Sequence, residues 1–302
     1  MKKIVITYEH PDLDCVSSAY AYSEYLNKIG ENADYYIKGN VKKDAEVVLE
    51  MFDIVLAGTN SIYDDDSIIV VDTNSLSDVS YVRPNNIVEI IDHHPDTGDR
   101  YLCKNAVSII ESVGAVATII AEKFRDNNVE ISREAAILLY YGIISNSVNL
   151  KANITSDRDK IIIDWLESKC SDINRLLVAE IFRRKSFFDI ANLRREMEVE
   201  IEFDVCSKRL VIGQLEIVDV DDFLSKYREN IENILRNVQI KKNLDYVFIN
   251  MIDILNGYHV ILTLDLDTEK FLFERVGYRF KEHIYRENKI VQRKDIKRLL
   301  KK

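Results

Sequence analysis

The sequence is poor in cysteine and has no long apolar run, and each shortage excludes a class of protein. No two of its cysteines form a Cys-x-x-Cys pair, which argues against a cysteine-bound zinc site and against a disulfide framework. No apolar run approaches the roughly 20 residues that a membrane span requires. These absences predict a cytoplasmic protein without a membrane partner. The four cysteines are Cys15, Cys103, Cys170 and Cys206.

The balance of charge is acidic. The chain has 302 residues and a formal net charge of −10, from 41 Lys and Arg against 51 Asp and Glu. An acidic chain argues against duplex nucleic acid as a partner, because duplexes favour a basic face. Most of the negative charge falls in residues 1–195, as expected if bound divalent cations offset part of it there.

The order of apolar and helical segments predicts an α/β protein with two domains. In residues 1–185 short apolar runs alternate with helical patterns, which is typical of a doubly wound parallel sheet. The segment 186–195 contains neither Gly nor Pro and is predicted to be a helical linker. Residues 196–302 predict a smaller α+β domain, in which the run 258–266 is expected to be a strand. We expect the site in the cleft between the two domains.

Three apolar runs of the first domain each end in carboxylates. Because open α/β sheets hold their active sites at the carboxyl ends of strands, these ends are candidate site segments. Solvated acidic turns that cap helices are the alternative, and they explain one such end well and all three poorly. The run 4–7 leads into Tyr8-Glu9-His10-Pro11-Asp12-Leu13-Asp14, the run 68–71 into Asp72, and the run 87–91 into Asp92-His93-His94.

The residue types at these strand ends suit a hard divalent cation. Asp12 and Asp14 are one residue apart, so in an extended turn both carboxylates project to the same side. Asp72 comes from an adjacent strand end and is placed to bridge two cations, and His93 adds an imidazole. Such mixed ligation favours Mn²⁺, Mg²⁺, Co²⁺ or Fe²⁺. A cation pair about 3.5–4 Å apart can activate water and hold phosphoryl oxygens.

The order Asp-x-Asp, lone Asp, Asp-His-His resembles the DHH phosphoesterase superfamily. The second half of the chain is similar to the C-terminal domain of the manganese-dependent (family II) inorganic pyrophosphatases and their exopolyphosphatase relatives. The resemblance spans nearly the whole chain, and four further segments carry it: 111–118, 138–147, 212–219 and 253–256.

The resemblance implies roles for individual residues of the first domain. Asp12, Asp14, Asp72 and His93 match metal ligands of the family. His94 matches the histidine that faces the substrate phosphate, and we expect His94 and Asp92 to be catalytic. A helix-capping or strand-end role is the alternative for His94.

Two positions depart from the family pattern. Tyr8 stands where the family has a histidine ligand, and a phenol with a pKa near 10 binds these cations poorly. Asn146 stands where the family has an aspartate, so it is expected to be a weak ligand that brings no charge. His10 is a further candidate ligand close by. Each of two metals is thus expected to lose one strong ligand.

A basic pair near the C-terminus resembles the Arg-Lys motif of the family. The resemblance implies that Arg293 and Lys294 bind substrate phosphate, because Arg can grip phosphate bidentately and Lys can act as a point charge. The alternative is a solvated basic tail.

The resemblance implies a hydrolase of phosphoanhydrides that uses a divalent cation, Mn²⁺ ahead of Mg²⁺ or Co²⁺. Inorganic pyrophosphate is the expected substrate, with short polyphosphate or another small phosphoester as the nearest alternative. The chain has no Gly-Gly pair, which argues against the nucleotide-cleaving branch of the superfamily with its Gly-Gly-rich signature. A rival from another class is a degenerate relative that binds phosphate compounds without hydrolysing them. A homodimer is compatible with the sequence.

Overall fold

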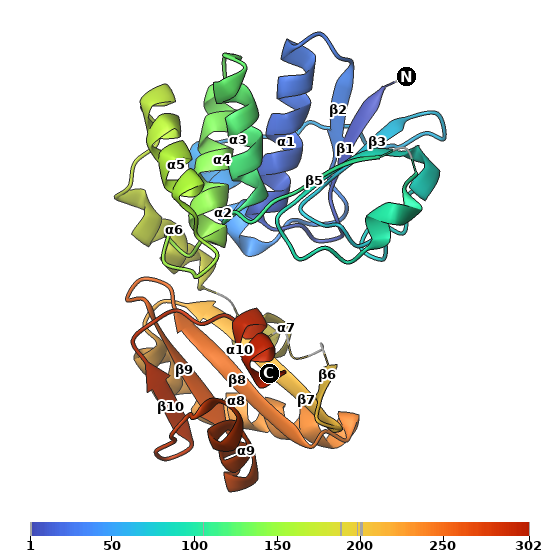
Figure 1. Cartoon of the computed structure of the whole chain (residues 1–302). Coiled ribbons are helices and arrows are strands. Elements are labelled where there is room, and N and C mark those ends of the chain that lie inside the picture. The colour runs from blue at the N-terminus through green and yellow to red at the C-terminus, as the bar shows by residue number, and fades with distance from the viewer. Residues whose placement is uncertain (1, 105, 188, 198, 200–201, 302) are drawn as a thin grey trace. The chain divides into compact units, whose positions relative to one another are not determined.

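The computed structural model describes residues 2–104, 106–187, 189–197, 199 and 202–301. The chain divides into two compact units, Met1–Ile181 and Phe182–Lys302, and each has its own sheet (Figure 1). The segment predicted to be a linker contributes η3 (Ile190–Asn192) and α7 (Leu193–Glu196) to the second unit.

The first unit contains a five-stranded sheet in which all neighbouring strands are parallel, as predicted for an α/β fold. The strand order is β2-β1-β3-β4-β5. The chain passes from β1 to β2 on one side and later returns to β3 on the other side of β1. Such a reversal brings the loops after the strands together at the carboxyl edge of a sheet. The strands are β1 (Lys3–Ile6), β2 (Ala33–Tyr36), β3 (Ser67–Val71), β4 (Ile87–Asp92) and β5 (Val107–Ile110).

A layer of packed helices accompanies this sheet. Helix α1 contacts α3 and α4, and α5 contacts both of these helices (Figure 1). Gly142 lets α1 and α4 approach closely, because a Cβ there would lie 2.6 Å from Ser17 Oγ. The helices of the first unit are α1 (Leu13–Lys28), α2 (Lys43–Phe52), α3 (Val116–Asp126), α4 (Arg133–Asn146) and α5 (Asp157–Lys169), and α6 (Leu177–Lys185) crosses the division between the units.

Loop segments rather than α-helices cover part of this sheet. Ile4, Ile68 and Ile90 of three strands pack with Val79 and Cys103 of the connections after β3 and β4. These connections contain the short turns η1 (Pro84–Asn86) and η2 (Asp99–Leu102). Asp, Asn and Ser are frequent in them, and such side chains compete with helical hydrogen bonds.

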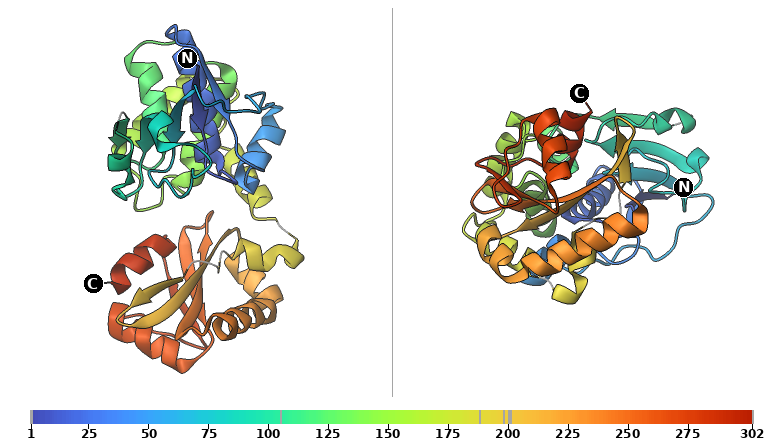
Figure 2. Two further views of the ribbon diagram at one scale, coloured as in Figure 1. Left: turned by 90° about the vertical axis from the view of Figure 1, so that its right-hand side faces the viewer. Right: turned by 90° about the horizontal axis from the view of Figure 1, so that it is seen from below.

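The second unit is built on a mixed sheet, which confirms the predicted α+β class of this domain. The strand order is β10-β9-β8-β7-β6, with β7 and β8 parallel and the other neighbours antiparallel. Helix α8 packs in one apolar cluster of this unit, and α9 and α10 pack in a second (Figure 2). The elements are β6 (Glu202–Val205), β7 (Lys208–Ile217), α8 (Val220–Lys242), β8 (Tyr246–Asp253), β9 (Tyr258–Thr263), α9 (Leu266–Val276), β10 (Ile284–Glu287) and α10 (Arg293–Leu300).

The strand predicted over 258–266 ends earlier than expected. Strand β9 stops at Thr263 because Asp265 caps α9, with its carboxylate accepting the Thr268 N–H at 2.7 Å. None of the helices in the described part of the chain is both long and apolar enough to cross a membrane.

A buried carboxylate joins the start of α5 to the loop before α3. Asp159 is fully buried and accepts hydrogen bonds from the Gly114 N–H at 2.9 Å and the Thr118 hydroxyl at 2.5 Å. It also accepts the Ser156 N–H at 2.6 Å, which completes a capping box at the start of α5. Because several donors depend on this one group, we expect it to stabilise the first unit strongly.

We predict that Asp159→Ala lowers the free energy of unfolding by about 2–4 kcal/mol, because it leaves buried donors without an acceptor. Urea unfolding followed by circular dichroism measures this loss. Asp157→Ala is the matched control, since Asp157 lies in the same helix turn and its side chain is 91% exposed. Equal stability of the two variants would contradict the assignment.

Candidate metal centre

Asp12 and Asp14 lie where α1 begins, directly after the loop that follows β1. Asp12 is the N-cap of α1, and its Oδ1 accepts the Cys15 N–H at 3.1 Å. Asp14 is buried, and its carboxylate accepts the N–H groups of Val116 at 2.9 Å and Ala117 at 2.8 Å, in the first turn of α3. Both carboxylates therefore bond to helix N-termini, where backbone N–H groups lack intrahelical partners.

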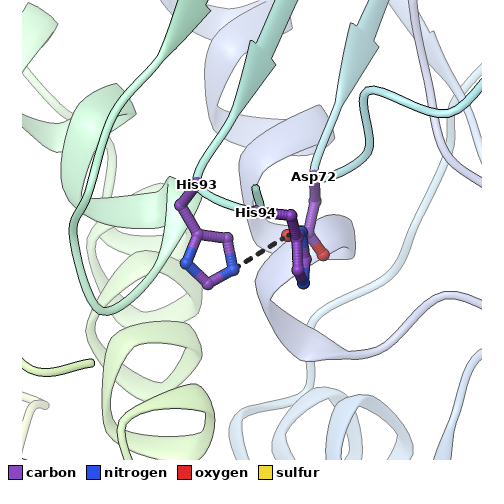
Figure 3. Close-up of side chains that lie close together, drawn as sticks. All are labelled: Asp72, His93 and His94. Atoms are coloured by element: carbon purple, nitrogen blue, oxygen red, sulfur yellow. Dashed lines mark ion pairs between the residues drawn. The ribbon is translucent and has the colours of Figure 1, made fainter. Parts of the chain in front are cut away.

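Asp72 follows β3 and carries a buried oxygen without a hydrogen bond. Its backbone is left-handed, with φ 62°, a conformation that Asp adopts more readily than most residues. Among the residues that the structure describes, Asp72 Oδ1 has no hydrogen-bond partner. This oxygen lies 3.5 Å from His93 Nε2 and 3.9 Å from His94 Nδ1 (Figure 3).

Each of the two histidines after β4 is oriented by a hydrogen bond from its Nδ1 atom. His93 Nδ1 lies 3.0 Å from the carbonyl of Val113 and so donates to it, which leaves the Nε2 lone pair facing Asp72 (Figure 3). His94 Nδ1 lies 2.9 Å from Asp92 Oδ1 and donates to that carboxylate. The His93 side chain is 3% exposed and that of His94 is 45% exposed. A backbone carbonyl or a carboxylate behind the ring is the usual arrangement of a metal-binding or catalytic imidazole.

Asn74 is a residue of this site that the sequence analysis did not single out. Its side-chain amide donates to Asp92 Oδ2 at 2.5 Å and to the Pro95 carbonyl at 3.2 Å, and its Oδ1 accepts the Thr97 N–H at 2.7 Å. Asn74 thus holds both Asp92 and the loop that carries His94. Its position two residues after Asp72 is a signal for this role, but the partners come from another strand end.

Asn146, at the end of α4, lies beside the same group with its amide nitrogen inward. Nδ2 lies 2.9 Å from the Gly114 carbonyl, 3.3 Å from Asp14 Oδ2 and 3.3 Å from His93 Nε2. An amide nitrogen donates hydrogen bonds, so metal ligation by Asn146 requires its oxygen in this place. The weak ligation expected of Asn146 stays a prediction.

Tyr8 and His10 occupy different surroundings in the loop after β1. The Tyr8 hydroxyl accepts the Asp12 N–H at 3.3 Å and lies 3.5 Å from Asp72 Oδ2, to which it donates. His10 is exposed, has φ 58° and lies with Nδ1 3.1 Å from the Asn40 carbonyl. The structure thus brings Tyr8 to Asp72 and holds His10 at Asn40, and ligation by His10 stays a prediction.

Burial sets the electrostatics of the site. It raises the pKa of Asp72 well above its ordinary value, and the neighbouring charges of Asp14 and Asp12 raise it further. Burial likewise raises the pKa of Asp14, with the charge of Asp12 adding to the effect. Burial also opposes the charged form of Asp92, but the hydrogen bonds and charge of His94, together with Asn74, hold its pKa below the usual value. Crowded buried carboxylates are costly unless a cation compensates them.

The donor set fits a divalent cation. One ligand atom each from Asp72, His93 and His94 lies within 4.8 Å of the others. The buried, unbonded Asp72 Oδ1 and the inward His93 Nε2 are the atoms that a cation would bind. Carboxylate and imidazole without thiolate favour Mn²⁺, Mg²⁺ or Co²⁺ over thiol-seeking metals.

The predicted phosphate-binding residues lie in the second unit, at the start of α10. The Arg293 N–H donates to Gln214 Oε1 of β7 at 2.6 Å. Asn250 of β8 donates to the Val291 carbonyl at 2.7 Å, directly before this helix. The backbone that carries Arg293 and Lys294 is therefore tied to two central strands, whereas a loose basic tail would have no such contacts. Their role in substrate binding stays a prediction.

Comparison with known proteins agrees with this geometry. Residues 2–143 match the DHH family, N-terminal domain. A manganese-dependent inorganic pyrophosphatase of Methanothrix thermoacetophila is 28% identical over 297 residues, which cover 97% of this chain and 95% of that relative. A manganese-dependent inorganic pyrophosphatase of Bacillus subtilis is also 28% identical, over 89% of this chain and 88% of its own.

A solved structure shares the fold of the whole chain. It comes from Methanococcus jannaschii and is assigned to the family II inorganic pyrophosphatases. Its TM-score is 0.73 with 21% sequence identity, and the match covers 99% of this chain and 98% of that one. The resemblance to the DHH phosphoesterases and the family II inorganic pyrophosphatases, inferred from the strand-end motifs, is confirmed.

Proposed function

We propose that this protein hydrolyses inorganic pyrophosphate with a bound divalent cation, Mn²⁺ ahead of Mg²⁺ and Co²⁺. The observation that carries the proposal is the buried, unbonded Asp72 Oδ1 beside the inward Nε2 of His93. The relatives named as manganese-dependent inorganic pyrophosphatases, which match over nearly the whole chain, support the substrate and the metal.

The side chains divide the work of this reaction. Asp72 and His93 would hold the cation, and the ligand roles of Asp12 and Asp14 stay predictions. A cation there would supply Lewis-acid stabilisation of phosphoryl charge and activation of water. Because the Nδ1–H of His94 is engaged by Asp92, its Nε2 is the atom available to a phosphate oxygen. His94 is half exposed, so it can meet substrate from solvent.

Arg293 and Lys294 of the second unit are the residues proposed to bind substrate phosphate. A guanidinium can hold two oxygens of one phosphate, and an ammonium adds a point charge. Hydrogen bonds to Gln214 and from Asn250 fix the backbone around this pair, which lowers the entropy lost on binding.

Two rival functions use the same residues. A short polyphosphate carries the same anhydride and terminal phosphate as pyrophosphate, so the site chemistry does not separate them. A degenerate relative that only binds phosphate compounds is favoured by Tyr8, whose hydroxyl bonds to Asp72 where an imidazole ligand would strengthen metal binding. Phosphate release from pyrophosphate, tripolyphosphate and dinucleotides with Mn²⁺, Mg²⁺ or Co²⁺ distinguishes these functions.

We propose three further properties: a reducing compartment, no duplex nucleic acid partner and a homodimer. The four cysteines are all free, which supports a reducing compartment such as the cytoplasm. The net charge of −10 supports the absence of a duplex nucleic acid partner. The homodimer stays a prediction.

We predict that Asp72→Asn lowers Mn²⁺-dependent pyrophosphate hydrolysis by about a hundredfold or more, because it removes the charge of the central ligand. Asn also tolerates the left-handed backbone at this position, so folding should be retained. Asp64→Asn is the control, since that side chain is 79% exposed and pairs with Arg83 on the surface. An unchanged rate in Asp72→Asn would rule out the proposed metal centre.

A second prediction concerns the departures from the family pattern. Tyr8→His together with Asn146→Asp should tighten Mn²⁺ binding by about tenfold or more, because it restores one imidazole and one carboxylate. Without metal, Asn146→Asp should lower the melting temperature, since its carboxylate would face Asp14 Oδ2 and the Gly114 carbonyl. Calorimetric titration and thermal melts with Mn²⁺ or EDTA measure both effects. Asn60→Asp, on the surface, should change neither.

A third prediction tests the second unit. Arg293→Gln should raise KM for pyrophosphate by about tenfold with a smaller change in kcat, because one charge-assisted contact to phosphate is lost. Arg298→Gln on the same helix is the control, since its side chain is 70% exposed and pairs with Asp295. Equal KM values for the two variants would assign Arg293 to the solvated tail.

A further inference from the structure

A lysine lies at the Asp12 end of the candidate metal centre. Lys42 Nζ is 3.9 Å from Asp12 Oδ2 and 5.8 Å from the centre of the Tyr8 ring. The Lys42 N–H donates to the Pro11 carbonyl at 2.8 Å, so the backbone of the lysine is tied to the loop that carries Asp12. The ammonium group is therefore held beside the site, while 47% of the side chain is exposed to solvent.

Tyr8 occupies the space between Asp12 and Asp72. Its hydroxyl accepts the Asp12 N–H and donates to Asp72 Oδ2. A phenol has an ordinary pKa near 10, so this hydroxyl brings no charge to the site near neutral pH. The Asp12 end of the site thus contains a neutral hydroxyl and an ammonium group.

The oxygens of the three candidate carboxylate ligands are unequally engaged. Asp12 Oδ1 accepts a hydrogen bond from the Cys15 N–H, and Asp12 Oδ2 faces the ammonium group of Lys42. Both carboxylate oxygens of Asp14 accept hydrogen bonds from backbone N–H groups in the first turn of α3. Within the described residues, Asp72 Oδ1 is the one of these oxygens that is buried without a hydrogen bond. It lies beside His93 and His94, away from the phenol that bonds to Oδ2, and this marks one cation position.

The charges are consistent with a single cation. One divalent cation and one ammonium carry three positive charges, which offset the three carboxylates of Asp12, Asp14 and Asp72. Asp92 is stabilised separately by hydrogen bonds from His94 and Asn74. A second dication at the Asp12 end would lie close to Lys42, and like charges at such distances repel.

We propose that this site binds one divalent cation, at Asp72 and His93, and that Lys42 supplies the second positive charge that faces the phosphate of the substrate. The contact with substrate rests on the proposed pyrophosphate hydrolysis, whereas the number of cations does not. Lys42 is then a substrate-binding residue, and Tyr8 is a positioning residue that holds Asp72 through its hydroxyl.

Equilibrium dialysis of the full chain against Mn²⁺, with metal analysis and electron paramagnetic resonance, tests the number of cations. We expect one equivalent per chain and the six-line spectrum of an isolated Mn²⁺ ion. Two equivalents with the spectrum of an exchange-coupled pair would overturn the proposal. The double variant Tyr8→His, Lys42→Gln removes both the phenol and the ammonium group from the Asp12 end of the site. We expect this variant to bind a second equivalent of Mn²⁺ per chain.

Lys42→Gln tests the lysine. Loss of the ammonium group should tighten Mn²⁺ binding about threefold, because one repelling charge is removed, and should raise KM for pyrophosphate about tenfold. Lys42→Arg should keep the KM within about threefold of wild type, since the charge is retained. Lys43→Gln is the matched control, because Lys43 is the next residue, is 48% exposed and pairs with Glu46 on the surface.

The two proposals fail in different ways. Unchanged Mn²⁺ affinity in Lys42→Gln, in protein whose melting temperature matches wild type, would overturn the role of Lys42. A wild type that binds one Mn²⁺ but releases no phosphate from pyrophosphate would refute the proposed function and leave the single-cation inference standing.

Discussion

The carboxylate of Asp14 and the N-terminal turn of α3 form the contact on which the candidate site depends. This buried group accepts the N–H groups of Val116 and Ala117, 102 and 103 residues further along the chain. It thereby joins the start of α1 to the segment that follows β5, and it lies beside Asn146 of α4. Unpaired helix-terminal amides stabilise an anion here, so the fold itself sustains a negative charge at the strand ends.

That negative charge sets the main physical constraint on function. Asp14 and Asp72 are buried close together, and both have raised pKa values because burial disfavours their charged forms. Protonation or a bound cation relieves the repulsion. The hydrogen bond from His93 Nδ1 to the Val113 carbonyl restrains rotation of the ring. The fixed imidazole and the buried unbonded oxygen of Asp72 therefore make cation binding the chemically reasonable way to balance the site.

Much of the framework could be predicted because its signals are local. The parallel sheet follows from alternating apolar and helical runs, and the carboxylates at the ends of β1, β3 and β4 follow from the rule for open α/β sheets. The largely apolar run 258–266 predicts a strand that is too long, because it includes Asp265, a typical helix N-cap. The packing of loop segments on the first sheet could not be predicted, because the contacts of Val79 and Cys103 with the strands form only on folding.

The sequence by itself determined the class of fold, the strand ends that carry Asp72 and His93, and the family resemblance, because these depend on residues that are neighbours in the chain. Only the tertiary structure decided which atoms of the site residues form hydrogen bonds and with which partners. It bonded Asp14 to α3, turned the amide nitrogen of Asn146 inward and placed Lys42 beside Asp12. Every residue has a backbone carbonyl and every residue except proline has a backbone N–H, so these groups leave no mark in the sequence. Partners that meet only on folding therefore could not be predicted from it.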